Sequence, residues 1–517
     1  MIRQAAARIC VGIMLAVALQ GEAAPDELQR LGVNLAGAEF GPLPGVVNKD
    51  YVYPGAKQFD YCKAKGLRLV RLPFKWERIQ PELLKPLDGE ELGRLDHVAK
   101  LAHQRDVALV LDMHNFARYR VQLIGSDDVP VAAFADVWRR LAEHYREEAA
   151  IVAYGVMNEP HGTKGTWPAA AQACVDAIRT VDKTHVVLVC GDNWGGAHSW
   201  QKYNNNLVLD DPAHRLVYEA HQYFDHDNSG RYNKIYDADG ANATTGVKRL
   251  QPFLEWLKRH NVRGFVGEFG VPDDDPRWLV VLDNALEEMR QHQVGGTYWA
   301  AGPWWNNYPL SLEPRDGSDR PQMAVMERHL AKTPALAPRP WIAAAEAAEA
   351  AAQAIREEDA RLGRRVYDFR SRGESYHYKN DESEYASGPI EDAGRKARKI
   401  TYRSNGNPAW VGVGVYFGAL DCRGHDALSL DVRAEAPCQL EVKAYTADNR
   451  KFTAKYAVDS SWKTVAISLA DLKQGDASFP REQRLQKIEF QPNASPAGNS
   501  LYLGALRLVA PAASTDP

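Results

Sequence analysis

Eight short apolar runs alternate with amphipathic stretches between about residues 31 and 330, and no other feature constrains the fold of this chain as strongly. Most of the runs are continuously apolar, as expected of parallel strands that are buried on both faces. The stretches between them carry apolar residues at helical spacing. The predicted strands are Leu31–Ala36, Leu67–Pro73, Val107–Met113, Ile151–Met157, Val186–Cys190, Leu216–His221, Gly264–Glu268 and Gly295–Trp299.

This alternation predicts a (β/α)8 TIM barrel, a fold that typically needs about 250 residues. We assign residues 25–335 to this domain. The alternative is an open, doubly wound sheet. That alternative is weakened because no glycine-rich phosphate loop follows the first predicted strand.

The composition changes after the predicted barrel. Pro334, Pro338 and Pro340 lead into a segment in which nine of the twelve residues 343–354 are alanine. This composition predicts a helical linker over residues 336–365. The helix is expected either to act as a semi-rigid spacer or to pack on one of the domains, as Trp341 and Ile342 would favour.

Residues 366–510 have the two-residue hydrophobic period of β-strands, as in Leu428, Leu430 and Val432. About eight short strands with turn residues between them predict an antiparallel β-sandwich. The segments 461–469 and 501–508 resemble jelly-roll modules that are often attached to polysaccharide-degrading enzymes. Residues 511–517 are expected to form a disordered tail.

The N-terminus carries a targeting pattern. Arg3 and Arg8 precede the apolar run Ile9–Leu19, which is too short to span a bilayer, and Gly21-Glu22-Ala23 follows it. These features predict a signal peptide over residues 1–24 and a secreted protein, extracellular or periplasmic. An uncleaved N-terminal anchor is the alternative; after cleavage we expect no membrane partner.

The charge and the cysteine content argue against a nucleic-acid-binding protein and against a zinc protein. Lys and Arg number 63 against 67 Asp and Glu, a net charge of −4, so we expect no nucleic-acid partner. The cysteines show no Cys-x-x-Cys spacing, so we expect no zinc site. Cys422 and Cys438 could pair in an oxidising compartment or remain free thiols.

Polar and aromatic side chains follow six of the predicted strands, where a barrel of this kind has its active site. Two of them are glutamates, Glu159 and Glu268. Paired carboxylates on either side of a sugar are what glycoside hydrolysis requires. The other residues at these strand ends are Arg71, His114, Asn158, His221, Tyr223 and Trp299.

Taken alone, each of these residues also has a structural interpretation. Arg71 could be a buried ion-pair partner, either histidine could be a satisfied core residue, and Glu159 could be a helix N-terminal carboxylate. The joint pattern, with each residue type at a strand end, favours a site.

The motif Asn158-Glu159-Pro160 after the fourth predicted strand, with Glu268 ending the seventh, resembles the clan of retaining glycosidases built on this barrel. With the residues at the other strand ends, the chain is similar to glycoside hydrolase family 5. The stretches 112–119, 124–125, 191–194 and 225–230 resemble its cellulase subfamily, which contains many endoglucanases. The resemblance covers about residues 28–332 and leaves out the C-terminal domain.

The resemblance implies a role for each residue. Glu159 would be the acid/base and Glu268 the nucleophile, kept ionised by Arg71 and a hydrogen bond from Tyr223. Asn158 would hydrogen-bond the sugar 2-OH. His114 and His221 would line the catalytic subsite, and Trp299 would offer a flat apolar face to the sugar.

Other residues on the same rim are candidates or decoys. Trp194 and Trp304 are predicted to extend the substrate groove, whereas Trp76 is expected in the core. The run 225–230 begins like a calcium loop, but its twelfth position is Tyr236, so we expect no metal ion. The acidic run 273–275 is interpreted as a solvated loop that caps the helix beginning at Pro276. The chemistry needs no cofactor.

The resemblance therefore implies a retaining endo-β-1,4-glucanase acting on β-glucan polysaccharide. A mannanase, a xyloglucanase or another β-glycanase of the clan remains an alternative, and a transglycosylase or a non-catalytic polysaccharide-binding protein is disfavoured. The C-terminal domain is either a carbohydrate-binding module or a structural buttress. Its candidates for a sugar-binding face are Trp410, Tyr416, Phe417, Tyr445 and Trp462.

Overall fold

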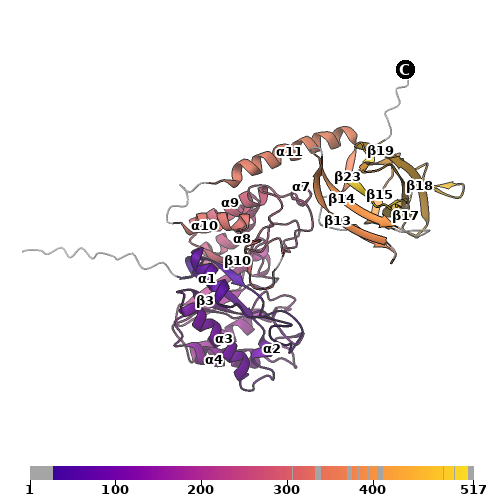
Figure 1. Cartoon of the computed structure of the whole chain (residues 1–517). Helices are drawn as coiled ribbons and strands as arrows, with labels where there is room; N and C mark the ends of the chain where they lie inside the picture. Colours follow the sequence, from indigo (N-terminus) through magenta and orange to yellow (C-terminus); the bar gives the residue numbers. More distant parts are fainter. Residues whose placement is uncertain are drawn as a thin grey trace, which may run out of the picture.

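A computed structural model describes residues 27–305, 307–331, 339–369, 375–381, 383–392, 395–404, 411–480, 482–493 and 495–510. The predicted signal peptide and the predicted C-terminal tail lie outside these residues. The described chain forms a barrel surrounded by helices, a long helix, and a domain of two β-sheets (Figure 1).

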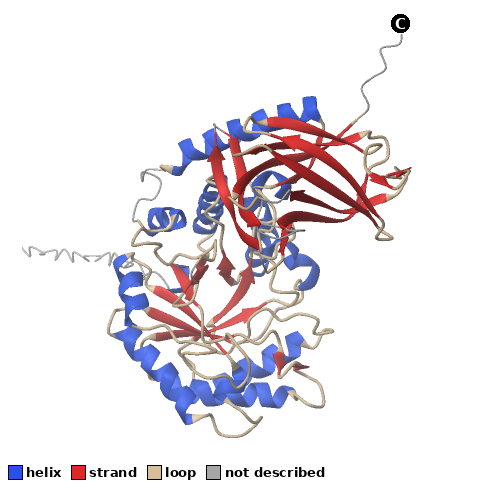
Figure 2. Cartoon of the chain, turned by 45° about the vertical axis from the view of Figure 1, so that its right-hand side comes forward, coloured by secondary structure: helices blue, strands red, loops and turns tan. Residues whose placement is uncertain are grey.

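The predicted (β/α)8 barrel is confirmed. Eight strands close a parallel barrel in the order β1-β10-β9-β8-β7-β6-β3-β2. Figure 2 shows helices lying around these strands. The barrel strands are β1 (Leu31–Leu35), β2 (Leu69–Phe74), β3 (Ala108–Met113), β6 (Ile151–Gly155), β7 (Val186–Cys190), β8 (Leu216–His221), β9 (Arg263–Phe269) and β10 (Gly295–Ala301).

The helices cover the barrel with their apolar faces. In α4, for example, Phe134, Val137, Trp138 and Leu141 are fully buried, which explains the helical spacing of apolar residues in the sequence. The longer barrel helices are α1 (Ala56–Ala64), α3 (Gly89–His103), α4 (Val131–Tyr145), α5 (Trp167–Arg179), α8 (Thr245–His260), α9 (Arg277–Gln291) and α10 (Pro321–Leu330). Short elements in the connections are η1 (Glu27–Gln29), α2 (Trp76–Ile79), the hairpin of β4 (Arg118–Tyr119) and β5 (Gln122–Leu123), η2 (Ala197–Ser199), α6 (Trp200–Tyr203) and α7 (Tyr236–Asp239).

The interior of the barrel has an apolar layer and a charged layer. Leu69, Val110 and Val217 belong to one buried apolar cluster. Two residues further along the same strands stand Arg71, Asp112 and Glu219. Since strand side chains alternate between faces, each charged residue faces the same side as its apolar neighbour. The charged layer therefore lies toward the carboxyl ends of the strands.

Helix α11 (Trp341–Leu362) joins the two domains and contacts both. On the barrel side Glu349 pairs with Arg277 of α9 at 2.9 Å. At its other end Asp359 pairs with Arg507 of the sandwich at 2.8 Å. The helix is thus neither a free spacer nor attached to one domain alone, and Figure 1 shows it running from the barrel helices to the sandwich.

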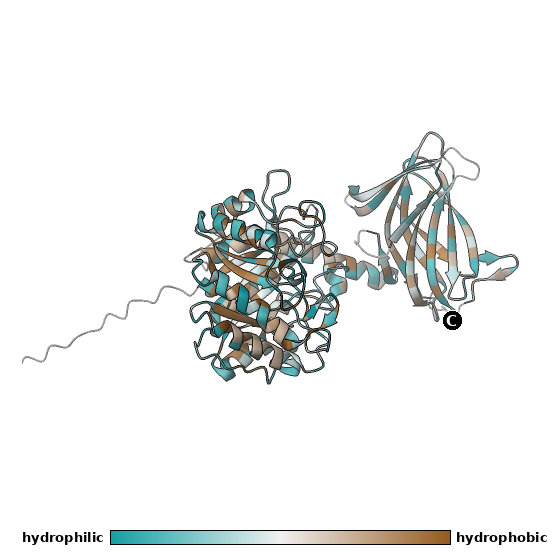
Figure 3. Cartoon of the chain, turned by 90° about the horizontal axis from the view of Figure 1, so that it is seen from below, coloured by the Kyte–Doolittle hydropathy of each residue, from teal (hydrophilic) through white to brown (hydrophobic). Residues whose placement is uncertain are grey.

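The predicted antiparallel β-sandwich is also confirmed. One sheet has the order β13-β14-β23-β16-β19 with β11 paired to β23, and the other has the order β12-β15-β22-β17-β18-β20-β21. Side chains of both sheets form a single apolar core between them. Figure 3 shows the alternation of hydrophobic and hydrophilic residues along these strands. The strands are β11 (Arg364–Asp368), β12 (Ser375–Lys379), β13 (Ser383–Asp392), β14 (Arg395–Ser404), β15 (Val411–Asp421), β16 (Ala427–Ala434), β17 (Cys438–Thr446), β18 (Lys451–Val458), β19 (Lys463–Ser468), β20 (Lys473–Gln474), β21 (Ala477–Ser478), β22 (Arg484–Pro492) and β23 (Asn499–Val509).

Two smaller expectations concern cysteines and membranes. Cys422 and Cys438 are both free thiols in this structure. No helix in the described part of the chain combines the length and the apolar character that crossing a membrane requires.

Candidate active site

Arg71 lies at the centre of the charged layer. Its guanidinium is fully buried and contacts three carboxylates: Glu219 through Nε at 2.9 Å, Asp112 through Nη2 at 2.9 Å and Glu268 through Nη1 at 3.3 Å. A buried cation needs such partners to offset its desolvation. Together these carboxylates raise the pKa of Arg71 above its usual value, although burial alone would lower it. Arg71 is therefore a permanent positive charge beneath the site.

Glu268, near the end of β9, is held at both carboxylate oxygens. Oε2 accepts a hydrogen bond of 2.8 Å from the Tyr223 hydroxyl, and Oε1 accepts one of 3.3 Å from Arg71. Burial, together with the charge of Glu159, raises the pKa of this carboxyl to about 7, even though His221, Arg71 and Tyr223 act in the opposite direction. These three groups are what keeps the ionised form accessible near neutral pH.

Glu159 follows β6 and faces Glu268. Its backbone has φ +43°, a left-handed conformation that few non-glycine residues adopt and that is common at functional sites. Its side chain is 18% exposed, against 6% for Glu268. One oxygen of each carboxyl and a ring nitrogen of His221 all lie within 4.8 Å of one another. A separation of about 5 Å suits a retaining glycosidase, whereas inverting enzymes hold their carboxyls about 6.5–9.5 Å apart.

His221 bridges the two glutamates. Its Nδ1 lies 2.9 Å from Glu159 Oε1 and 3.6 Å from Glu268 Oε2, and its Nε2 lies 3.3 Å from Glu219. Burial would lower the pKa of this ring, but the surrounding carboxylates outweigh it and raise the pKa to about 10. The ring is therefore a cation at neutral pH that donates a proton to Glu159 and one to Glu219.

His114 is the opposite case. Burial lowers its pKa well below the usual value, and the charges of Arg71 and Lys75 lower it further. The neutral ring donates from Nδ1 to Asp112 at 2.8 Å, and its Nε2 accepts from the Asn158 amide at 3.2 Å. Asn158 in turn accepts from Arg71 at 2.8 Å. The amide of Asn158 is therefore fixed at both ends.

The structure brings together every residue that the sequence predicted at the strand ends, and it adds three that the sequence did not single out. These are Asn34, Asp112 and Glu219. Asp112 and Glu219 each stand two residues before a predicted histidine on the same strand, a spacing that could have identified them. Asn34 is buried in β1 and contacts Arg71 at 3.0 Å. All three contact Arg71 and so help to fix the position of its guanidinium.

The predicted aromatic residues lie in different settings. Trp299 stacks on the His114 ring with 5.7 Å between centroids. Trp194 is 51% exposed and stacks on His161, close to Glu159 in the chain. Trp304 is exposed as well, but it is the neighbouring Trp305 whose ring contacts Trp299. Trp76 is fully buried against Tyr119 and Phe134, so the prediction that it belongs to the core is confirmed.

Two acidic segments were candidates for other roles. In the calcium-like loop the Asp225 carboxylate accepts from the backbone of Gly230 and Tyr232, so it stabilises its own loop. The prediction of a solvated run at 273–275 is wrong for Asp273, which pairs with Arg320 at 2.7 Å and is largely buried. Asp275 does accept a bond from the Arg277 backbone at the start of α9, as a cap would.

Within the described residues, one cluster has the spacing of metal ligands, and it consists of Glu159, His221 and Glu268. These atoms are already joined by hydrogen bonds to one another, to Tyr223 and to Arg71. The protonated ring of His221 offers no lone pair at either nitrogen. The donor set therefore fits an acid/base site better than a metal site.

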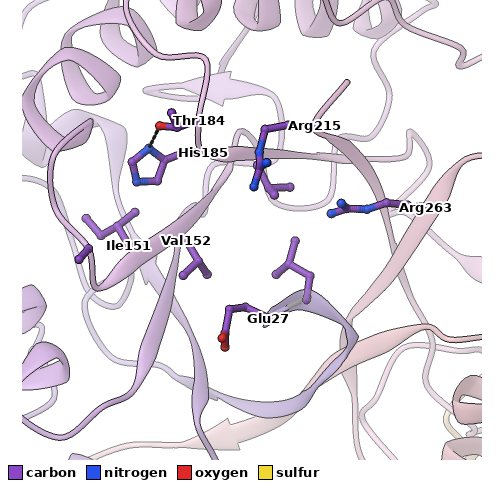
Figure 4. A pocket seen from close by; sticks show the side chains of 10 residues that line it. Glu27, Ile151, Val152, Thr184, His185, Arg215 and Arg263 are labelled. Carbon is purple, nitrogen blue, oxygen red and sulfur yellow. Dashed lines mark hydrogen bonds between the residues drawn. The ribbon is translucent and has the colours of Figure 1, made fainter. Parts of the chain in front are cut away.

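A separate pocket lies at the other end of the barrel (Figure 4). It is lined by residues at the amino ends of the strands, among them Ile151, Val186 and Arg263. Active sites of this fold lie at the carboxyl ends. This pocket is therefore distinct from the cluster around Glu159 and Glu268.

The aromatic residues proposed as a sugar-binding face of the second domain do not share one face. Trp462 lies beside Tyr502, and its N–H donates to Asp392 at 2.8 Å. Asp392 and Tyr502 belong to one sheet, whereas Tyr445 belongs to the other. Phe417 packs against the core. Tyr416 of β15 and Tyr445 of β17 lie on either side of Lys487 of β22, in one sheet. Trp410 lies outside the described residues.

Comparison with known proteins gives a consistent result. The family model described as "Cellulase (glycosyl hydrolase family 5)" matches residues 32–305. An endo-beta-1,4-glucanase B of Aspergillus niger is 32% identical over 298 residues, which is 56% of this chain and 86% of that protein. An endo-beta-1,4-glucanase B of Emericella nidulans is 31% identical over 318 residues, 59% of this chain and 94% of that protein.

Solved structures match a similar share of the chain. The Pseudomonas stutzeri endoglucanase Cel5A in complex with cellobiose is 45% identical, with a TM-score of 0.57, over 59% of this chain and 92% of that one. XacCel5A in complex with cellopentaose is 40% identical, with a TM-score of 0.56, over 59% of this chain and 99% of that one. The family model thus covers the barrel strands and none of the second domain.

Proposed function

The chain belongs to glycoside hydrolase family 5, and we propose that it is an endo-β-1,4-glucanase that cleaves internal bonds of β-glucan with retention of anomeric configuration. The observation that carries this proposal is the pair of unlike carboxyls, Glu159 and Glu268, within 4.8 Å of each other beside His221. The endoglucanase relatives and the bound cellobiose and cellopentaose of the similar structures support a β-1,4-glucan substrate.

In the first step, Glu268 attacks the anomeric carbon as the bond from that carbon to the leaving oxygen breaks. Glu159 gives its proton to this oxygen, which departs as the hydroxyl of the released chain. A glycosyl ester on Glu268 remains. Arg71 and Tyr223 favour the carboxylate that attacks, since each interacts with its negative charge.

In the second step, Glu159 takes a proton from water, and the water oxygen bonds to the anomeric carbon as the ester breaks. Both carboxyls then return to their starting states. Asn158 is held by Arg71 and His114 in one orientation, which suits a contact to the sugar 2-OH that strengthens in the transition state. Trp299 supports this subsite with an aromatic face beside His114.

The roles of the two glutamates can be separated with 2,4-dinitrophenyl β-cellobioside, whose leaving group departs without a proton. Glu159→Ala should release one equivalent of dinitrophenol rapidly and then turn over slowly. Azide should accelerate this turnover by attacking the ester on Glu268. Glu268→Ala should show no burst of dinitrophenol. A burst of dinitrophenol from Glu268→Ala together with none from Glu159→Ala would reverse the two roles. Either result alone would refute the assignment.

Substrate choice is tested by comparing cellohexaose with mannohexaose and a xyloglucan oligosaccharide. The proposal predicts the highest kcat/KM on cellohexaose, with cellobiose to cellotetraose as early products of internal cleavage. Faster cleavage of either other oligosaccharide would reassign the substrate within the family. Chain lengthening at high cellohexaose concentration would identify a transglycosylase.

We propose in addition that residues 1–24 direct the enzyme out of the cell. Determining the N-terminus of the secreted protein tests this proposal, which predicts cleavage after about residue 24.

A further inference from the structure

One face of the second domain carries a set of tyrosine, lysine and acidic or amide side chains. The pairing of strands places Tyr376 of β12, Gly414 of β15, Glu489 of β22 and Lys443 of β17 side by side across four strands. The residues between them in sequence, such as Val413, point into the core. We name this outer surface the tyrosine face, defined as Tyr376, Tyr378, Tyr416, Tyr445, Lys443, Lys487, Glu489 and Gln491.

Two of the tyrosine rings lie flat on the sheet because β15 has glycines beneath them. A Cβ at Gly412 would meet the Tyr378 ring closer than 3.0 Å, and a Cβ at Gly414 would meet the Tyr376 ring equally closely. Both rings are half-buried, with one face against the glycines. The ammonium groups of Lys443 and Lys487 lie 5.8 Å from the centroids of the Tyr378 and Tyr376 rings, respectively. The centroids of the two rings are 6.5 Å apart.

Hydrogen bonds hold these rings in place. The Tyr376 hydroxyl donates to Glu489 at 2.7 Å, and the Tyr445 hydroxyl donates to the other oxygen of Glu489 at 3.0 Å. Lys487 donates to Glu489 at 2.7 Å and lies over the Tyr445 ring. Glu489 itself is only 7% exposed. A buried carboxylate with three donors around it is an organised site, which a merely solvated sheet face does not need.

The second ring has its own partner. Tyr378 donates to the Gln491 carbonyl oxygen at 3.3 Å, and Lys443 donates to the same oxygen. The amide nitrogen of Gln491 donates to no other residue in the described ranges. An amide donor thus stands at the edge of a flat aromatic ring.

We propose that the tyrosine face binds a β-1,4-glucan chain; this inference rests on the proposed function, since it takes the polymer that the barrel is proposed to cleave. Sugar rings present apolar C–H faces that stack on aromatic rings and hydroxyl edges that hydrogen-bond to amides, carboxylates and ammonium groups. The face spans three inter-strand steps, roughly 14 Å at about 4.8 Å each, which is room for several sugar units.

The composition of the face favours a neutral polymer over a protein or a nucleic acid. None of its eight side chains is aliphatic, whereas the centre of a protein interface is usually apolar. Lys443 and Lys487 are balanced by Glu489 and the nearby Glu441, so the face has no basic excess for phosphates. Because α11 is bound to both domains, a chain held here would stay close to the barrel and raise its local concentration there.

The test compares adsorption of the full-length protein to amorphous cellulose at 4 °C with its kcat/KM on soluble cellohexaose. The variant Tyr376→Ala/Tyr378→Ala removes both rings, and Tyr376→Phe/Tyr378→Phe keeps them. The control is His377→Ala, on the same strand between the two tyrosines, whose ring stacks on Tyr385 of the other sheet. Thermal unfolding of each variant verifies folding.

The proposal predicts that the double alanine variant loses at least five-fold in its partition coefficient on cellulose. The phenylalanine variant and His377→Ala should adsorb within two-fold of the parent, and all should hydrolyse cellohexaose equally. Unchanged adsorption of the folded double alanine variant would overturn the proposal, as would a parent protein that does not adsorb. Failure of the proposed function would be seen separately, as absence of cellohexaose hydrolysis by the parent.

Discussion

The Tyr223 hydroxyl donates a 2.8 Å hydrogen bond to Oε2 of Glu268, the oxygen on the side of His221. Glu268 is almost completely buried, and its other oxygen contacts Arg71 at 3.3 Å. The nucleophile is thus an ionised group in a site that burial alone would keep neutral. How strongly Tyr223 and its neighbours stabilise this charge decides how reactive the enzyme is at a given pH.

Replacing Tyr223 with phenylalanine removes this bond and preserves the ring. A hydrogen bond to a charged group contributes about 1.5–3 kcal/mol, so kcat/KM should fall by about 10- to 100-fold. The Tyr223→Phe protein should keep the thermal stability of the parent within a few degrees. Steady-state kinetics on cellohexaose measure the effect. A loss below two-fold would mean that this hydroxyl does not stabilise the attacking carboxylate.

The pH dependence follows from the pKa of Glu268, which is raised to about 7, chiefly by burial. The carboxyl attacks only when ionised, so a raised pKa means that kcat/KM of the free enzyme falls as the pH drops through about 7. His221→Gln removes a positive charge 3.6 Å from Glu268. It should therefore raise the pKa of Glu268 and move this acid limb to higher pH.

His114→Gln is the control for that experiment, because burial keeps the His114 ring neutral. Replacing it removes no charge, so the acid limb should stay where it is in the parent even if kcat falls. Equal shifts in the two variants would show that the effect comes from lost packing and not from the charge of His221.

Trp194 tests the extension of the groove. Its ring is half-exposed and stacks on His161, which positions it on the rim beside Glu159. Trp194→Ala should raise KM for cellohexaose by about five-fold, equivalent to about 1 kcal/mol of stacking, with kcat nearly unchanged. Trp194→Phe should recover most of the loss. A fall in kcat with constant KM would place Trp194 in the chemistry instead of in substrate binding.

Arg277 tests the attachment of helix α11. This arginine contacts Asp237, Asp275 and Glu349, and it is largely buried. Arg277→Met would remove the buried cation from all three carboxylates and leave only the half-exposed Arg356 beside Asp237 and Glu349, at a loss of about 2 kcal/mol of stability. We expect faster proteolysis within residues 339–365 and normal kcat/KM on cellohexaose. The matched control is Arg356→Met, because Arg356 is about half exposed and pairs with two of the same carboxylates.

The sequence was sufficient to predict the barrel and the residues at its strand ends. Buried parallel strands give apolar runs that are easy to recognise, and Arg71, Glu159 and Glu268 each interrupt or end one. Glu219 also interrupts an apolar run, two residues before His221, but its ion pair with Arg71 of another strand could not be predicted from that spacing. Such contacts join strands that are far apart in the sequence, and they form only when the barrel closes.

The second domain shows a different limit. The two-residue period predicted a sandwich, but a period does not reveal which strands are neighbours. Tyr376 and Glu489 are 113 residues apart and meet only because β12, β15 and β22 are adjacent. The alanine-rich segment likewise predicted a helix, whereas its attachment to both domains depends on Arg277 and Arg507, which lie outside the helix.

A double displacement by Glu268 and Glu159 predicts the order in which the two anomers appear in a proton NMR time course of cellohexaose digestion. The new reducing ends should appear first as the β-anomer, with the α-anomer following only at the rate of mutarotation. If the α-anomer appears first, the reaction inverts configuration, and Glu268 cannot be the nucleophile of a glycosyl-enzyme intermediate.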